Sequence, residues 1–434
     1  MTMFETAREL LGQFKGDTFV SGFGVLPEAG RLCAALGRRA VLVRDVFPGS
    51  ERHVDAIVAS LLAAGVEIAA TIPGAAPNAP LADLARVEAE LRTYNPDVIV
   101  SFGGGSTIDC TKAAEVLRSL GGPVEDYFGT GLVTAKLKAS GARLAPHLAI
   151  QSAASSAAHL TKYSNITDVT AGQKKLIVDD AIVPARALFD YAVTLDAPES
   201  LTADGALDGL AHCLEVYYGA TGKPAYSHIE EVALTGIALV MEYLPRAVCD
   251  PRDREAREGL GYATDLGGYS IMLGGTNGAH LTSFSLIDIL SHGRACALMN
   301  PYYTVFYSPA VQAQLHAVAG LCTRFGMGAA EMERRSGRAL ADAVANALIG
   351  LERVVGNPAT LGEVPGFSSR HIDRALTAAK NPQLRMKLEN MPVPLRPEEV
   401  DDYMGPVLAA AVAGDLTVVR DYAAPPSAGG SARS

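Results

Sequence analysis

The residue types with the most distinctive chemistry are one aspartate and three histidines in two stretches of the chain. Asp208 and His212 are four positions apart in L-D-G-L-A-H-C-L-E, a segment whose residues favour a helix. Because positions i and i+4 share a helix face, this carboxylate and this imidazole can point at one ion. His280 and His292 supply two more imidazoles. Together they form a mixed oxygen and nitrogen site, which suits a borderline divalent ion such as Fe²⁺ or Zn²⁺.

A glycine-rich segment, S-F-G-G-G-S-T-I-D-C-T-K, lies upstream and contains Gly103, Gly104, Gly105 and Ser106. It follows a predicted strand and opens a predicted helix. Glycines let the backbone approach a pyrophosphate, and the free N–H groups at a helix start hold its charge. The alternative interpretation is a plain strand-to-helix turn. The position at the carboxyl end of a strand, where open α/β sheets bind ligands, favours a nucleotide site.

Asp45 ends another predicted strand, in V-L-V-R-D-V-F-P. A carboxylate at this position can accept hydrogen bonds from ribose hydroxyls and repels a 2′-phosphate. This feature favours NAD(H) over NADP(H), although an ordinary aspartate at a strand end remains the alternative.

The elements around these residues change in character along the chain. In the first part, short apolar runs alternate with helical spacing, which predicts a doubly wound parallel sheet with helices on both faces. The predicted strands are 39–43, 66–72, 97–102, 148–151 and 187–190, and the helices between them are 53–65 and 81–94. Long amphipathic stretches then follow, at 205–221, 226–243, 254–273, 308–326 and 330–354.

This change predicts two domains. We expect an α/β dinucleotide-binding domain over residues 1–195 and an all-helical metal-binding domain over residues 196–422. The tail 423–434, A-A-P-P-S-A-G-G-S-A-R-S, has the composition of a disordered segment.

Composition excludes several classes of protein. The chain has 434 residues, 49% of them hydrophobic, which is enough for a sizeable core, and its formal net charge is −10. Such a charge argues against general binding to nucleic acid or to anionic membranes. The six cysteines form no C-x-x-C pair, so we expect reduced thiols in a cytoplasmic protein. The N-terminus lacks the pattern of a signal peptide, and the apolar run 56–75 is too interrupted to span a bilayer.

Three motifs in order resemble the iron-containing (group III) alcohol dehydrogenases. They are G-G-G-S-T-I-D-C-T-K, D-G-L-A-H-C-L-E and N-G-A-H followed by S-H-G-R-A, and the resemblance covers residues 18–305. It implies a dehydroquinate synthase-like architecture, a homodimer or larger assembly, and a small alcohol or aldehyde substrate. It also implies that the metal ligands are Asp208, His212, His280 and His292. By the same resemblance, the dinucleotide contacts are Gly103, Gly104, Gly105, Ser106 and Asp109, with Asp45 at the ribose.

The chain departs from the family pattern around the metal motif. Phe284 stands where the family usually has a second histidine, which is implicated in relaying a proton. His280 and His292 are also closer in sequence than is usual. We therefore expect a divergent subgroup whose proton exit differs. The apolar residues between the two histidines either line a pocket or belong to the core, and we favour the core.

A second departure lies in the segment Q-S-A-A-S-S-A-A-H, residues 151–159, where the family usually has threonines, glycines and an acidic residue. Ser152 and Ser156 keep hydroxyl groups that can bind the nucleotide. His159 replaces the acidic residue. It either serves the cofactor or proton path, or has a structural role.

These parts predict a metal-dependent NAD(H) alcohol dehydrogenase or aldehyde reductase. A bound ion lowers the pKa of the substrate hydroxyl, and hydride passes between the carbinol carbon and the nicotinamide. One alternative is a dehydroquinate synthase-like lyase or a dehydrogenase of phosphate-bearing substrates, for which Arg294 and Lys162 are nearby basic residues. The other is a non-catalytic nucleotide-binding or scaffold protein.

Overall fold

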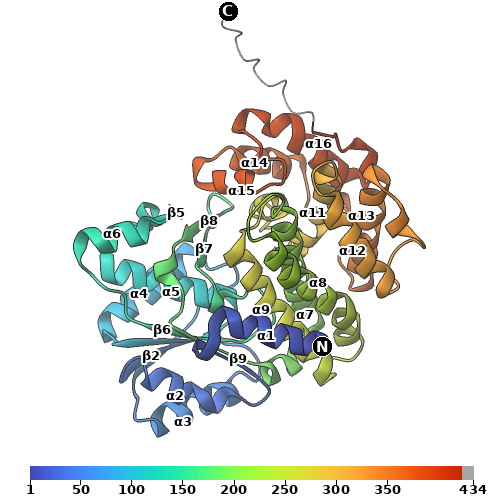
Figure 1. Ribbon diagram of the computed structural model, residues 1–434. Helices are drawn as coiled ribbons and strands as arrows, with labels where there is room; N and C mark the ends of the chain where they lie inside the picture. Colours follow the sequence, from blue (N-terminus) through green and yellow to red (C-terminus); the bar gives the residue numbers. More distant parts are fainter. Residues whose placement is uncertain (423–434) are drawn as a thin grey trace, which may run out of the picture.

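The computed structural model describes residues 1–422, which form a sheet-containing half and a helical half (Figure 1). The predicted disorder of residues 423–434 lies outside the described residues. The main sheet has six parallel strands in the order β1-β9-β6-β4-β2-β3. These strands are β1 (Phe19–Gly22), β2 (Arg39–Arg44), β3 (Glu67–Pro73), β4 (Val98–Gly103), β6 (His147–Gln151) and β9 (Arg186–Asp190). The predicted parallel sheet is therefore confirmed.

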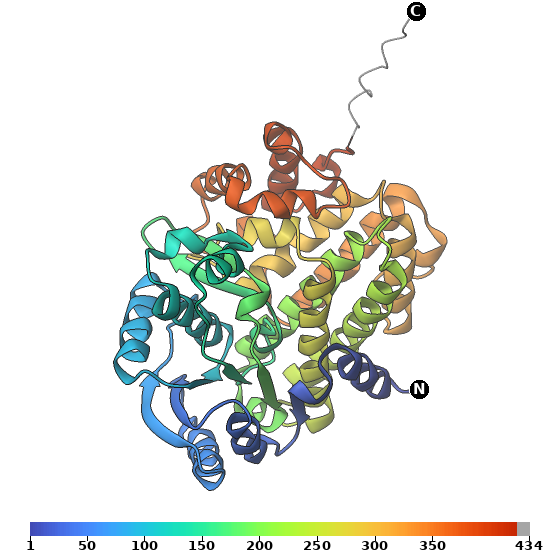
Figure 2. The same cartoon turned by 60° about the vertical axis from the view of Figure 1, so that its left-hand side comes forward.

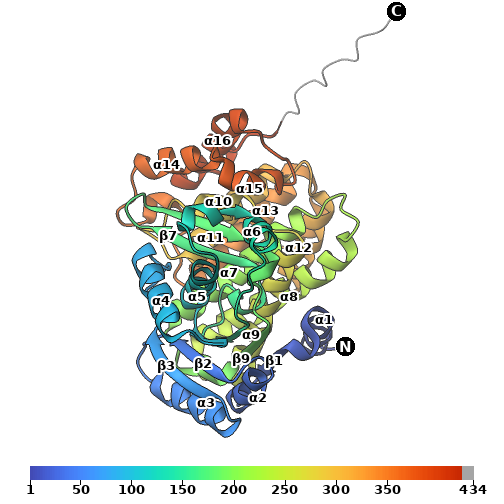
Figure 3. The same ribbon diagram turned by 90° about the vertical axis from the view of Figure 1, so that its left-hand side faces the viewer.

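Helices cover both faces of this sheet (Figure 3). One face packs against α2 (Ala29–Ala34) and α3 (Glu51–Ala63). The other packs against α4 (Leu81–Tyr94) and α5 (Gly105–Leu120), and α6 (Leu132–Ser140) lies beside them. All six residues of β4 are buried, as expected of a parallel strand covered on both sides.

The strand order places the glycine-rich segment at a switch point. From β2 the chain runs outward to β3 and then returns to the other side of β2 as β4. Asp45 follows β2 and Gly104 follows β4, so both lie at the carboxyl edge where neighbouring connections diverge. Open α/β sheets bind ligands in this crevice.

A second, smaller sheet was not predicted. It has the order β5-β8-β7, in which β7 (Tyr163–Asp168) and β8 (Gln173–Val178) form an antiparallel hairpin and β5 (Gly129–Thr130) adds two residues. The hairpin packs against α5 on one side. On the other side, Tyr163, Leu176 and Val178 share an apolar cluster with residues of the helical half. It therefore bridges the two halves.

From residue 199 to the end of the described chain the regular elements are helical. The central helices α7 (Glu199–Tyr218), α8 (Tyr226–Cys249), α9 (Arg254–Leu273) and α11 (His292–Tyr307) bury one large core. Around them lie α10 (Gly278–Ser283), α12 (Gln312–Arg324), α13 (Gly337–Val354), α14 (Ser369–Ala379), α15 (Arg385–Glu389) and α16 (Val400–Ala413). The predicted helical C-terminal region is confirmed.

Among the described residues, α8 alone is long and apolar enough to cross a membrane by length and composition. In the structure 61% of its most apolar stretch is buried, and the helix packs against α7 and α9. Burial in the core accounts for its composition.

The first helix, α1 (Met3–Lys15), belongs to the helical half by its contacts. A capping box between Thr2 and Glu5 starts it. Ala7, Leu10 and Leu11 then face the core formed with α8 and α9, while β1 begins only four residues after the helix ends (Figure 2).

Candidate metal centre and cofactor site

Four donor side chains converge from three helices. Asp208 and His212 lie one turn apart on α7, His280 lies on α10, and His292 is the first residue of α11. Oδ1 of Asp208 is 3.7 Å from Nε2 of His212, 3.6 Å from Nε2 of His280 and 3.7 Å from Nε2 of His292. We call these four residues the donor cluster.

The donor cluster fits a divalent ion. Two ligands about 2.1 Å from one tetrahedral ion lie roughly 3.4 Å apart, close to the separations in the cluster. Oδ1 of Asp208 and Nε2 of His280 are buried and have no hydrogen-bond partner in the described part of the chain. Buried polar atoms without partners are costly, and a shared cation satisfies them together.

The protonation states also suit a cation. Burial alone would raise the pKa of Asp208, but the imidazoles of His212, His292 and His280 hold it well below its usual range. Burial lowers the pKa of His212 to about 4. Burial and the nearby ammonium of Lys174 lower the pKa of His292 well below 6.5. An ionised carboxylate and neutral imidazoles are the forms that bind a metal, and Asp208, His212 and His292 are held in these forms. Burial alone would lower the pKa of His280, but Cys296 and Glu215 hold it well above 6.5, so this imidazole releases a proton when an ion binds.

Glu215 orients one of the imidazoles. It lies on α7 two turns after Asp208 and is fully buried. Its Oε1 is 2.6 Å from Nδ1 of His280, and its Oε2 accepts hydrogen bonds from the backbone N–H groups of Asn277 and His280. Since Nδ1 is engaged in this way, Nε2 of His280 is left to face Asp208.

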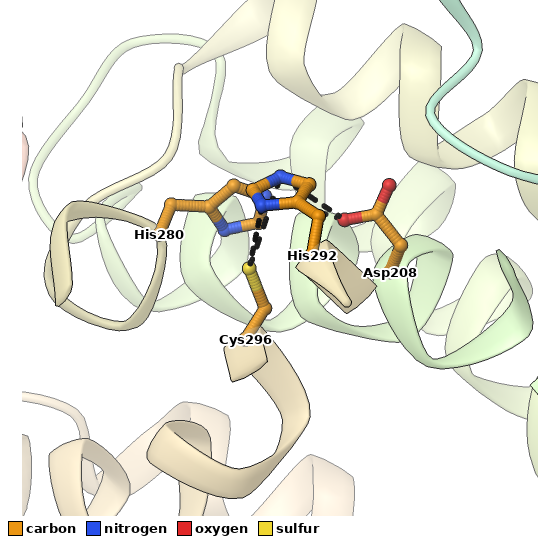
Figure 4. Close-up of side chains that lie close together, drawn as sticks. All are labelled: Asp208, His280, His292 and Cys296. Carbon is orange, nitrogen blue, oxygen red and sulfur yellow. Dashed lines mark hydrogen bonds and ion pairs between the residues drawn. The ribbon is translucent and has the colours of Figure 1, made fainter. Parts of the chain in front are cut away.

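The structure adds Cys296, which sequence reasoning treated only as a reduced thiol. Its Sγ lies 3.9 Å from Nδ1 and 4.0 Å from Nε2 of His292. Donor atoms of Asp208, His280, His292 and Cys296 all lie within 4.8 Å of one another (Figure 4). The i to i+4 spacing from His292 was the available signal, and it is the spacing that identified Asp208 with His212.

The segment 151–157 links the glycine-rich segment to the donor cluster. Ser152 N–H donates to the carbonyl of Gly103, and Ser156 N–H donates to Oδ2 of Asp208 at 3.1 Å. The side-chain oxygen of Ser156 is buried without a hydrogen-bond partner among the described residues, and a Cβ on Gly105 would lie 2.5 Å from it. Ser156 therefore sits between the start of α5 and the donor cluster.

The glycine-rich segment has one glycine that packing does not require. A Cβ on Gly103 would collide with Asp45 and Thr107, whereas a Cβ on Gly104 would meet only Oδ2 of Asp45, at 3.9 Å. Space beside Gly104, the N-cap of α5, leaves room for a ligand phosphate. Asp45 borders this space, and it accepts hydrogen bonds from Gly104 N–H and the Thr107 hydroxyl.

Two predicted cofactor residues face the protein in the structure. The Ser106 hydroxyl accepts a hydrogen bond from Asn78 N–H. Asp109 is buried, and its Oδ2 accepts hydrogen bonds from the backbone and side-chain nitrogens of Asn165 on β7. Contacts of these two residues with a dinucleotide stay predictions.

His159 lies in the core with another titratable group. Its Nε2 is 3.1 Å from Oδ1 of Asp265, both side chains are fully buried, and its ring packs against Phe19 and Phe189. Burial lowers the pKa of His159 and raises that of Asp265, so the pair is held in the uncharged state. These surroundings favour the structural interpretation.

Phe284 occupies the position where the family usually has its second histidine. It is buried, its ring centroid is 6.0 Å from that of His292, and the ammonium of Lys387 lies 5.4 Å from its ring centroid. Leu281, Phe284 and Leu286 all belong to the helical core, as we favoured. Lys387 and Lys174, which the sequence analysis did not single out, are buried, and burial lowers the pKa of Lys387 to about 8.

Comparison with known protein families matches most of the described chain. The family described as iron-containing alcohol dehydrogenase matches residues 17–191, and the Fe-containing alcohol dehydrogenase family, C-terminal, matches residues 202–393.

Individual relatives point the same way. The NAD-dependent methanol dehydrogenase of Bacillus methanolicus is 28% identical over 77% of this chain and 83% of its own length. The 1,3-propanediol dehydrogenase of Klebsiella pneumoniae is 26% identical over 69% of this chain and 76% of its own. The sulfoacetaldehyde reductase of Bilophila wadsworthia is 28% identical over 50% of this chain and 54% of its own.

Solved structures share the fold. An archaeal halo-thermophilic alcohol dehydrogenase from a Red Sea brine pool matches with a TM-score of 0.78 and 22% identity, over 91% of this chain and 96% of that one. The alcohol dehydrogenase of Oenococcus oeni also has a TM-score of 0.78 at 22% identity, over 91% and 98%.

Proposed function

The chain belongs to the iron-containing alcohol dehydrogenase family and is therefore an oxidoreductase of alcohols or aldehydes. We propose that its donor cluster holds one divalent ion at the reaction centre. The observation that carries this proposal is the convergence of three Nε2 atoms on the unpartnered Oδ1 of Asp208. We propose Fe²⁺ or Zn²⁺, both of which accept this mixture of donors.

A bound divalent ion supplies Lewis acidity, which favours the alkoxide of an alcohol and polarises an aldehyde carbonyl. The protein fixes the geometry. Asp208 and His212 are held one helical turn apart, and Glu215 fixes the ring of His280. Asp208, His212 and His280 are buried and His292 is partly exposed, so most of the cluster is shielded from water, which strengthens electrostatic interactions there.

For the cofactor we propose NAD(H), bound across the carboxyl edge of the sheet. The space beside Gly104 and the start of α5 support a pyrophosphate site, and the carboxylate of Asp45 beside it disfavours a 2′-phosphate. Ser152 and Ser156 lie on the path from this edge to the donor cluster. A homodimer or larger assembly in the cytoplasm is part of the same proposal.

An aldehyde with an anionic substituent is a second candidate substrate, and two buried lysines favour it. The ammonium of Lys387 lies 5.4 Å from the ring centroid of Phe284, which packs beside His292, and the positive charge of Lys174 helps to lower the pKa of His292. Lys174 also borders a cavity of about 390 Å³ between the β7–β8 hairpin and α14. A sulfonate or carboxylate tail would add a further negative charge beside these ammonium groups.

The test is anaerobic turnover of Fe²⁺-loaded and Zn²⁺-loaded protein, followed by NADH absorbance. The aldehyde panel pairs neutral short aldehydes with sulfonated or carboxylated ones of similar length. We expect turnover that depends on the metal and is lost in His280→Ala. The control is His228→Ala, because His228 on α8 bonds the Tyr269 hydroxyl instead of a cluster residue. Turnover unaffected by His280→Ala would refute the metal proposal, and equal rates on paired aldehydes would refute the anionic substrate.

A further inference from the structure

We propose that the thiolate of Cys296 is a fifth protein ligand of the ion and biases the site toward Zn²⁺ over Fe²⁺. This inference rests on the proposed function, because it presupposes an ion in the donor cluster. It concerns a residue that the metal motif itself does not include.

The helix geometry brings the thiol to the cluster. Cys296 is one turn after His292 on α11, so the two side chains leave the same helix face. Figure 4 shows the sulfur directed toward the rings of His280 and His292. A donor set reaching the ion from α7, α10 and α11 therefore includes two residues from α11.

The distances between the donor atoms are slightly larger than one ion can bridge, so a small movement of the side chains is enough for all of them to bind it. Two donor atoms that bind one ion with bonds of about 2.1 to 2.3 Å lie no more than roughly 4.6 Å apart. The donor atoms of Asp208, His280, His292 and Cys296 are spread over at most 4.8 Å. A shift of a few tenths of an ångström among these donor atoms brings the set within this limit.

Unpartnered atoms point to the same space. Oδ1 of Asp208 and Nε2 of His280 are both buried without hydrogen-bond partners among the residues described. The thiol of Cys296 is buried as well, and its Sγ lies 3.9 Å from Nδ1 of His292. A cation contacted by all three groups satisfies the orphaned oxygen and nitrogen.

Charge balance supports the thiolate. When the ion binds, the S–H bond of Cys296 breaks, the proton leaves to solvent and a sulfur–metal bond forms. The charges of one carboxylate and one thiolate then neutralise a divalent cation in a buried site. Thiolate is a soft ligand and favours Zn²⁺, whereas the donor cluster by itself does not discriminate.

Cobalt spectroscopy tests the proposal without relying on turnover. Co²⁺ is added to the full-length protein, and the visible ligand-field bands and the near-ultraviolet thiolate-to-Co²⁺ band are recorded. We expect both in the wild type, and loss of only the thiolate band in Cys296→Ser and in Cys296→Ala. The matched control is Cys322→Ser, because Cys322 is equally buried but lies on α12, outside the cluster.

Metal competition gives the second readout. We expect the preference for Zn²⁺ over Fe²⁺ to fall by about tenfold or more in Cys296→Ser. Ligand-field bands without a thiolate band in the wild type would overturn the proposal and leave the donor cluster intact. Absence of all Co²⁺ bands in the wild type would overturn the proposed function as well.

Discussion

The backbone N–H of Ser156 donates a 3.1 Å hydrogen bond to Oδ2 of Asp208, which ties the proposed cofactor segment to a proposed metal ligand. Ser156 and Ala157 both have left-handed backbone conformations, with φ of 49° and 50°. Non-glycine residues adopt this region at a cost, so the surrounding packing must hold them there. Because Oδ2 is engaged by Ser156, Oδ1 of Asp208 is left to face the imidazoles.

The absence of a side chain at Gly205 permits the hydrogen bond between Ser156 and Asp208, and we expect a larger residue at position 205 to break this bond. A Cβ on Gly205 would lie 1.8 Å from the carbonyl oxygen of Ala154, so Gly205→Ala must displace the segment that carries Ser156. We expect a loss of about 1–3 kcal/mol in the free energy of unfolding, together with weaker metal and NADH binding. Urea unfolding and titration calorimetry measure these effects.

Gly209→Ala is the matched control for Gly205→Ala, one turn further along α7. Its Cβ would meet the nearest atom, the carbonyl oxygen of Ala263, at an ordinary 3.6 Å. Alanine also favours a helix over glycine by about 1 kcal/mol, so we expect unchanged or higher stability. Equal destabilisation by the two substitutions would show that the approach of Ala154 is unimportant.

Glu215→Gln should weaken metal binding without unfolding the protein. The amide keeps the shape of the side chain but loses the negative charge that faces Nδ1 of His280. Loss of a group that orients a ligand lowers metal affinity by about 10–100-fold, and chelator competition measures this change. Glu352→Gln, at a buried carboxyl group that accepts a hydrogen bond from Asn357 and lies outside the cluster, should leave the metal affinity unchanged. Equal affinities for wild type and Glu215→Gln would contradict the orienting role.

Asp45→Asn should relax the preference for NADH. The substitution removes a negative charge beside Gly104 and keeps an oxygen that can accept its hydrogen bond. A like-charge repulsion of about 1.4 kcal/mol corresponds to a factor of ten, so we expect the NADPH-to-NADH ratio of kcat/KM to rise about tenfold. Asp97→Asn is the control, because Asp97 binds Arg38 and Arg39 at the opposite end of the sheet. A ratio that stays constant would remove Asp45 from cofactor recognition.

The buried carboxyl of Glu352 should make stability depend on pH. Burial raises its pKa from 4.5 to about 8, so between these values the folded state holds a proton that the unfolded state releases. Its contribution to stability is therefore complete below pH 4.5 and is lost as the pH rises through 8. Glu352→Gln should remove about 4 kcal/mol of the decline between pH 5 and pH 8, measured by urea midpoints. Glu363→Gln, at an exposed carboxylate, should leave the decline as in the wild type.

The sequence predicted most of the elements that carry a clear apolar period. The strand at β4 and the helix at α4 have strongly patterned residues, and the structure confirms both. The β7–β8 hairpin escaped notice because Lys174 and Lys175 interrupt its second strand with charges. Lys174 is buried among acidic residues of other elements, a compensation that spacing along the chain does not show.

Some residues of the candidate site could be predicted from the sequence and others could not. Asp208 with His212 is visible in sequence because both belong to one helix face. The contact of Glu215 with His280 and the approach of Cys296 to the cluster depend on how α7, α10 and α11 pack together. The contact of Ser156 with Asp208 was harder still to predict. It depends on a left-handed backbone conformation at Ser156, and no sequence pattern in the segment 151–159 indicates that conformation.

The placement of α1 has a consequence for synthesis on the ribosome. Its apolar face, Ala7, Leu10 and Leu11, is made before α9, one of the helices that cover it. The helix α9 ends at Leu273, which is 258 residues after Lys15. At about 5–20 residues per second, that helix emerges only tens of seconds later. During this interval the sheet-containing half can form, while the apolar face of α1 has not yet packed against α8 and α9. The apolar face of α1 therefore gains its cover only after α8 and α9 have been made.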